Sequence, residues 1–172
     1  MNRKHFISQS LPLVAGLIAV DAINVSAGTS RSFQQPAPLK MEIVKEFVGA
    51  GHGNIDRVKE MLVNHPNLLY SRYDWGNGDF EEAIEGAGHV GNREIAELLI
   101  KEGARLNLFV MTMLGKTALV KPILEAYPDL IFAKGAHGFT LLHHARKGGD
   151  AALELHDYLM SKNLKETQIK IK

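Results

Sequence analysis

Histidine is the side chain of this sequence best suited to chemistry at neutral pH, because its pKa of about 6.5 lets it act as an acid, a base or a metal ligand. Half of the eight histidines fall in one C-terminal stretch, and these are His137, His143, His144 and His156. A zinc site needs three or four ligands, commonly at a short spacing such as H-E-x-x-H, and no pair among these histidines has it. We therefore expect no metal ligands and no cofactor. A metal- or small-ligand-binding protein that uses these four histidines stays an alternative.

The acidic side chains of one short segment are a second candidate for chemistry. They are Asp79, Glu81, Glu82 and Glu85. Two carboxylates can serve as a general acid and a general base. Neighbouring charges on a loop and a helix start are more often a solvated face that complements the helix dipole, and we expect that role here.

Two further catalytic patterns are incomplete. Residues 86–91, GAGHVG, match the dinucleotide-binding fingerprint, but a buried strand before them and an acidic residue about 20 positions later are missing. These glycines are expected to serve helix packing. Ser71 and Ser161 lie outside any G-x-S-x-G turn, and the chain has no cysteine. We therefore expect no catalytic residue and no enzyme activity.

The elements that must position these side chains recur along the chain. Each copy is a short helix, a glycine and a second helix with apolar residues three and four positions apart. Two copies are explicit in residues 53–62 and 91–100, where Gly-Asn opens the second helix, and further copies follow Gly115 and Gly149. Each copy leaves an apolar face that it cannot cover alone, so neighbouring copies must stack.

The fourth copy carries the most specific motif. Its residues 138–145, GFTLLHHA, resemble the G-x-T-P-L-H-x-A signature of the ankyrin family, with Leu141 in place of proline. Gly103-Ala104 is similar to the glycine-alanine ending of the family's repeat. The resemblance covers residues 39–163. It implies an all-α ankyrin-repeat solenoid of about four helix-turn-helix repeats with short hairpin fingers, in which His143 is structural and bonds neighbouring finger backbone.

Two loops depart from the family's pattern. Only seven residues separate Asn107 from Gly115, which leaves room for a helix but not for the finger before it. The segment between Leu68 and Phe80 is longer than a standard finger and holds the only tryptophan, Trp75. We therefore expect one missing finger and one overbuilt finger.

The resemblance implies a protein-protein interaction scaffold whose partner the sequence does not identify. The expected contact residues lie on two fingers and are Tyr70, Arg72, Tyr73, Trp75, Lys134, His137 and Phe139. Aromatic and arginine side chains dominate interface energies. Trp75 and Tyr73 are equally suited to covering the end of the apolar core, and both interpretations stay open. An inhibitor or accessory subunit of an exported enzyme is a variant of the same hypothesis.

The N-terminal residues predict export. Residues 1–27 have the layout of a signal peptide, with Arg3 and Lys4 before an apolar stretch and small residues up to Ala27, and their start is similar to a twin-arginine signal. The apolar stretch, residues 11–20, is too short for a permanent membrane helix. We expect cleavage after Ala27, a periplasmic or extracellular location and no stable membrane anchor.

Charge and composition complete the domain organisation. The 20 basic and 19 acidic side chains nearly cancel, which argues against nucleic acid as a partner. Residues 28–38 hold two prolines and little to bury, so they predict a flexible linker before the ankyrin-repeat domain of residues 39–163. The tail, residues 164–172, has a strand-like alternation whose role is open.

Overall fold

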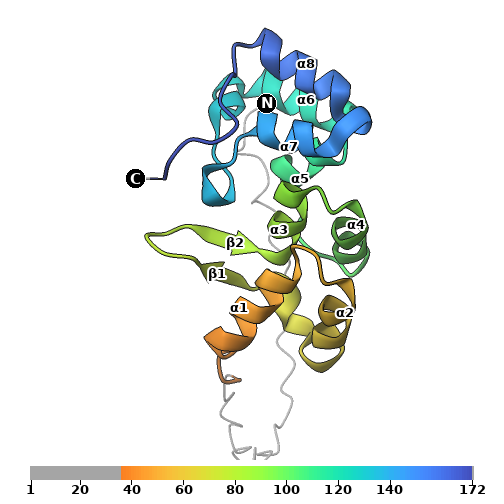
Figure 1. Ribbon diagram of the computed structural model, residues 1–172, viewed down its shortest axis with the longest axis vertical. Helices are drawn as coiled ribbons and strands as arrows, with labels where there is room; N and C mark the ends of the chain where they lie inside the picture. Colours follow the sequence, from red (N-terminus) through yellow and green to blue (C-terminus); the bar gives the residue numbers. More distant parts are fainter. Residues whose placement is uncertain (1–35, 172) are drawn as a thin grey trace, which may run out of the picture. The chain divides into compact units, whose positions relative to one another are not determined.

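The structure, a computed structural model, describes residues 36–171 (Figure 1). A compact unit begins at Ala37. The predicted signal peptide of residues 1–27, its cleavage site and most of the predicted linker lie outside the described residues. Within the described part of the chain, no helix combines the length and the apolar character needed to cross a membrane.

The described chain is mostly helical, as the sequence predicts. Its α-helices, in pairs, are α1 (Met41–Ala50) and α2 (Ile55–Asn64), α3 (Ala83–Val90) and α4 (Arg93–Lys101), α5 (Leu108–Met113) and α6 (Thr117–Ala126), and α7 (Leu141–Gly148) and α8 (Leu153–Ser161). Four 3-10 helices complete the helical elements: η1 (Pro66–Tyr70), η2 (Pro128–Phe132), η3 (Ala136–Gly138) and η4 (Gly149–Ala152). The first helices of the pairs contact one another in order, α1 with α3, α3 with α5 and α5 with α7 (Figure 1).

The Gly-Asn pairs of the sequence mark where the second helices begin. The Asn54 side chain accepts a hydrogen bond from the Arg57 backbone N–H and so caps α2, and Asn92 caps α4 through the Ile95 N–H. Gly91 ends α3 with a φ of 84°, a left-handed conformation that favours glycine. A glycine stop followed by an asparagine start therefore produces the sharp turn between α3 and α4.

The only sheet among the described residues is the long finger, an antiparallel pair of β1 (Arg72–Asp74) and β2 (Phe80–Glu82) with Tyr73 opposite Glu81. A shorter finger, residues 134–140, is closed by one bridge between Lys134 and Thr140. Between them, α5 begins directly after its capping residue Asn107. The described chain therefore forms no third hairpin between the long finger and the short finger.

The apolar core consists of two groups of buried side chains. Phe47, Ile84 and Leu99 are central to the group shared by α1 to α5. The second group belongs mainly to α6, α7 and α8. Helix α5 joins them, since Val110 is buried in the first group and Phe109 packs against the second.

Candidate functional site

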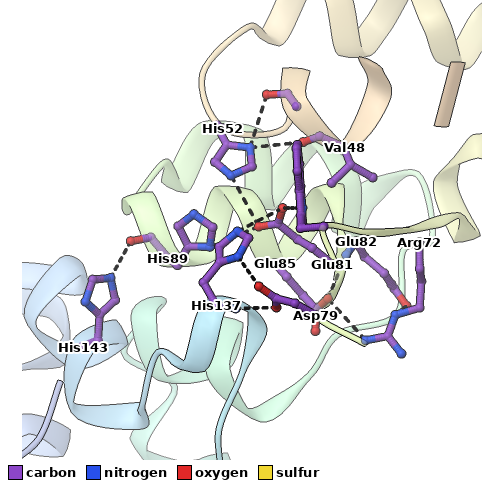
Figure 2. Close-up of polar contacts among 12 residues, drawn as sticks. Val48, His52, Arg72, Asp79, Glu81, Glu82, Glu85, His89, His137 and His143 are labelled. Carbon is purple, nitrogen blue, oxygen red and sulfur yellow. Dashed lines mark hydrogen bonds and ion pairs between the residues drawn. The ribbon is translucent and has the colours of Figure 1, made fainter. Parts of the chain in front are cut away.

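Four side chains with metal-ligating atoms converge in the fold, as Figure 2 shows. They are His52, Glu81, His89 and His137, here named the His-Glu cluster, and one ligand-type atom from each lies within 4.8 Å of the other three. They come from the turn after α1, from β2, from α3 and from η3. Because three helix pairs contribute, only the folded chain brings these atoms together.

Glu81 is the centre of the His-Glu cluster and is completely buried. Its Oε1 lies 3.4 Å from His52 Nε2 and 3.2 Å from His89 Nδ1. Its Oε2 lies 3.5 Å from His137 Nε2 and accepts a 2.6 Å hydrogen bond from the Trp75 indole N–H. Burying a carboxylate costs free energy unless positive charge and hydrogen bonds compensate it, so Glu81 depends on these neighbours for its stabilisation.

His52 presents Nε2 to Glu81 because its other ring nitrogen is engaged. Nδ1 lies 3.2 Å from the carbonyl oxygens of Val48 and Gly49, so Nδ1 carries a proton. Gly86 makes room for the ring, since a Cβ there would lie 2.9 Å from two of its atoms. The nearby Glu81 carboxylate raises the pKa of His52 above its ordinary value, and burial opposes this effect.

Asp79 fixes the ring of His137 in a similar way. Its Oδ2 lies 2.7 Å from His137 Nδ1, and its Oδ1 accepts the His137 backbone N–H at 2.8 Å. Because Nδ1 is engaged, Nε2 is the nitrogen that faces Glu81. A carboxylate behind a histidine is the outer support that metal-binding histidines commonly have.

His89 is buried, and no carboxylate of the described residues supports its ring from behind. Burial, followed by the nearby His52 and His137, lowers the pKa of His89 to about 3, so its ring is neutral at physiological pH. Its Nδ1 and Glu81 Oε1 lie 3.2 Å apart, yet neither makes a hydrogen bond to any described residue. Buried polar atoms are nearly always paired, and each unpaired one costs about 1–3 kcal/mol. Two such atoms facing each other form an arrangement that a cation stabilises.

The ligand set suits a transition metal. Three imidazole nitrogens and one carboxylate oxygen are typical of zinc and its neighbours, with bonds of about 2.0–2.2 Å. In a tetrahedron, such bonds place neighbouring ligand atoms roughly 3.3 Å apart. Glu81 Oε1 lies at about this spacing from two imidazole nitrogens, at 3.2 and 3.4 Å, and the third nitrogen lies 3.5 Å from Oε2. The side chains of His52 and His137 are 30% and 27% exposed, so the group opens to solvent on their side.

Two of the predicted contact residues support the His-Glu cluster, and a third belongs to it. Trp75 is 39% exposed and holds Glu81 through its indole N–H. Tyr73 packs edge-on against Trp75 with ring centroids 4.9 Å apart. His137 is one of the four members. This part of the long finger therefore shapes a polar site.

Of the other predicted contact residues, Phe139 packs against the His-Glu cluster, with its ring centroid 5.1 Å from that of His89, and the remaining three are exposed. Tyr70 is 46% exposed, and the Arg105 guanidinium lies 5.3 Å from its ring centroid. Arg72 and Lys134 are exposed, whereas Phe139 is half-buried. Tyr70, Arg72 and Lys134 are therefore accessible to a partner.

Only His137 of the four C-terminal histidines joins the cluster. His143 Nε2 bonds to the His89 carbonyl oxygen at 2.8 Å (Figure 2), and His144 Nδ1 donates to the Thr140 carbonyl oxygen at 2.8 Å. His156 lies beside the exposed Asp157. A ligand site made of these four histidines alone does not assemble in the described chain.

Sequence reasoning missed two histidines and misjudged the acidic segment. His52 and His89 each follow a glycine near the end of a first helix, but they lie at different distances from the Gly-Asn pairs, so no repeat position marks them both. The expected solvated face is wrong for Glu81 and Glu82, which are both buried. The reason is that β2 pairs with β1 and continues directly into α3, and this path of the backbone places both carboxylates in the interior.

A groove of about 580 Å³ occupies the place of the missing finger. Its lining includes Phe80 of the long finger, Phe109 of α5, and Leu130 and Lys134 near the short finger. Phe80 is 49% exposed and Leu130 is 37% exposed. The lining of the groove thus combines apolar rings with charged side chains, among them Arg72, Asp79, Glu85 and Lys134.

The fold and the site together define a mostly helical protein with a buried carboxylate among three histidines. Comparisons with models of protein families, with curated proteins and with solved structures found no significant match.

Proposed function

We propose that this protein binds one divalent transition-metal ion of the zinc class through His52, Glu81, His89 and His137. The observation that carries this proposal is the pair of unsatisfied buried atoms, Glu81 Oε1 and His89 Nδ1. A metal ion placed between them takes the lone pair of a neutral imidazole and the charge of the carboxylate at once. His52 and His137 complete the ligand set, because outer oxygen atoms already engage their Nδ1 atoms.

The donor chemistry selects among metals. Calcium and magnesium take oxygen ligands almost exclusively, and a site with three imidazoles offers them too few. Imidazole nitrogen suits zinc, copper, nickel and iron, and a set of three imidazoles and one carboxylate is typical of zinc sites. We therefore take Zn²⁺ as the probe and expect Ca²⁺ and Mg²⁺ to fail as competitors.

Titration of the metal-free full chain with Zn²⁺ tests the proposal. We expect one saturable site that Glu81→Gln largely removes, because glutamine keeps an acceptor for the Trp75 indole but loses the negative charge. Glu97→Gln is the matched control, since Glu97 lies on the exposed side of α4 and 57% of its side chain is exposed. No saturable zinc uptake, or equal uptake by both variants, contradicts the proposal.

The frame that carries this site is proposed to be an ankyrin-repeat stack in an exported protein. The ordered contacts of α1, α3, α5 and α7 support the stack. The ring of His143 bonds to the His89 carbonyl oxygen of helix α3, and not to the finger backbone that the resemblance implies. Export rests on residues 1–27 alone. The mass of the protein recovered outside the cytoplasm tests it, and a mass that still includes these residues argues against cleavage after Ala27.

A second candidate function, a protein-protein interaction scaffold, is favoured by the groove at the missing finger. The exposed ring of Phe80 and the partly buried ring of Phe109, with Lys134 and Arg72 beside them, fit an extended apolar segment of a partner protein that carries an acidic residue. An inhibitor or accessory subunit of an exported enzyme is one form of such a partnership.

Capture experiments with the metal-loaded chain separate the two functions. If a partner uses the groove, Phe80→Asp abolishes capture and leaves zinc binding intact. If the partner instead uses Trp75 and the fingertip, Trp75→Ala abolishes capture. Capture that survives both substitutions contradicts the scaffold hypothesis at this face.

A further inference from the structure

The C-terminal tail runs beside the short finger that carries His137. The Ile169 backbone N–H donates to the Gly138 carbonyl oxygen at 2.8 Å, and the Thr140 N–H donates to the Thr167 carbonyl oxygen at 3.0 Å. The Gln168 side chain adds a hydrogen bond to the His137 carbonyl oxygen at 2.9 Å. Backbone and side-chain groups of the tail thus hold both sides of His137.

The tail is also anchored to the fold on its own account. The Thr140 hydroxyl donates to the Glu166 carbonyl oxygen at 2.7 Å, and Leu164 is completely buried in the second core group. Leu164 and Glu166 therefore fix the start of the tail, and residues 167–169 extend from that point along the finger.

His137 adopts a backbone conformation that needs such support. Its φ of 57° lies in the left-handed region, which is unfavourable for a residue with a Cβ. Gly138 follows with a φ of 72°, and a Cβ there would overlap the Ile169 carbonyl oxygen. The finger and the tail therefore approach so closely that one cannot change without the other.

We propose that the C-terminal tail is a positioning element of the metal site, which sets metal affinity by holding the His137 loop in its ligating conformation. The inference rests on the metal-binding function proposed above. Of the four ligands, Glu81 and His89 come from β2 and α3, and His52 comes from the turn after α1, next to the first core group. His137 instead sits on a finger that is held by one bridge, by Asp79 and by the tail. Asp79 orients the ring of His137, and the tail holds the backbone on either side of it.

Thermodynamic coupling makes the inference quantitative. If the docked tail raises the affinity for the metal by some factor, the bound metal must stabilise tail docking by the same factor. Couplings of this type commonly amount to about 5- to 150-fold, and we expect about tenfold. A tail that only stabilises the fold behaves differently, because its loss destabilises the metal-free and metal-bound forms equally and leaves the affinity unchanged.

The test compares zinc affinity, measured by competition with a chelator, in the full chain and in three variants. The first ends at Lys165, the second is Ile169→Pro, which removes the N–H that Gly138 accepts, and the third is Gln168→Ala. Lys170→Pro is the matched control, since no backbone hydrogen bond of the Lys170 N–H occurs within the described residues. The single substitutions keep the test valid if the shortened chain does not fold.

We expect about tenfold weaker zinc binding for the shortened chain and for Ile169→Pro, a smaller loss for Gln168→Ala and none for Lys170→Pro. The visible spectrum of bound Co²⁺ should change in the weakened variants, because one imidazole leaves the coordination sphere. Hydrogen exchange of residues 166–171 should slow when zinc binds to the full chain.

Two results overturn the inference in distinguishable ways. If the full chain takes up zinc but the variants bind it equally well with an unchanged Co²⁺ spectrum, the tail is only structural and the metal site stands. If the full chain itself takes up no zinc, the proposed function fails, and the positioning role fails with it.

Discussion

His89 and His144 are both buried histidines on first helices of their pairs, but their polar surroundings differ. His144 is almost completely buried, which lowers its pKa to about 4, and its Nδ1 is satisfied by the Thr140 carbonyl oxygen. His89 has a pKa of about 3, and its Nδ1 faces Glu81 without a hydrogen bond. Burial alone therefore does not distinguish a structural histidine from a functional one. The lack of a hydrogen-bond partner for Nδ1 distinguishes them.

The largest expected effect separates these two histidines directly. His89→Ala removes a ligand, and we expect zinc affinity to fall by about 100-fold or more, beyond the 10- to 100-fold typical of outer-shell changes. His144→Ala should leave zinc affinity unchanged and lower the free energy of unfolding by roughly 1–3 kcal/mol, because the Thr140 carbonyl loses a partner. Zinc titration and urea unfolding of both variants measure this contrast. Equal effects on zinc affinity would break the comparison.

The pH dependence of stability offers the next largest effect. The pKa of His144 is about 4 in the folded chain and about 6.5 when unfolded, so the unfolded state binds more protons between these values. The resulting stability is present above pH 6.5 and is lost as pH falls toward 4. Between pH 7 and pH 5 this single group accounts for a loss of about 2 kcal/mol.

His144→Leu in the presence of a chelator measures that contribution. The loss of unfolding free energy from pH 7 to pH 5 should be about 2 kcal/mol smaller in His144→Leu than in the unchanged chain. His65→Leu, at an exposed histidine, serves as the control. His52 acts in the opposite direction, since its raised pKa stabilises the fold below pH 6.5 and ceases to do so as pH rises through the folded value. An unchanged acid sensitivity in His144→Leu contradicts the assignment.

An intermediate effect is expected from the support behind His137. Asp79→Asn keeps the size of the side chain but weakens the hydrogen bond that fixes the ring of His137, so zinc affinity should fall about tenfold. The matched control is Asp157→Asn, at an exposed carboxylate beside His156, which should change nothing. Chelator competition on both variants provides the measurement. A loss as large as that of His89→Ala would instead make Asp79 a direct ligand.

The helical architecture could be predicted from the sequence because its signals are local. Asn54 and Asn92 cap the helices that they precede, and apolar residues three and four positions apart lie on one helix face. The short separation of Asn107 and Gly115 also predicted that α5 would start without a hairpin before it.

The site could be predicted only in part. The sequence predicts Trp75 and His137 as partner contacts, which stays a prediction, and it does not predict their place at the His-Glu cluster. His52 and His89 were not found, because their convergence depends on the packing of α1 against α3 and no local spacing encodes it. Glu81 looked like one charge in an acidic run, since sequence alone does not show that β2 buries it.

The smallest expected effect concerns the hydrogen bond between Trp75 and Glu81. Trp75→Phe keeps an aromatic ring against Tyr73 and removes only the indole N–H, so the effect on zinc affinity isolates that bond. A net hydrogen bond contributes about 1 kcal/mol, which corresponds to roughly fivefold weaker zinc binding. Tyr73→Phe is the control, because it retains the ring contact. If Trp75→Phe binds zinc as tightly as the unchanged chain, Glu81 is held in place by its buried position alone, and the indole belongs to the partner surface that the sequence suggested.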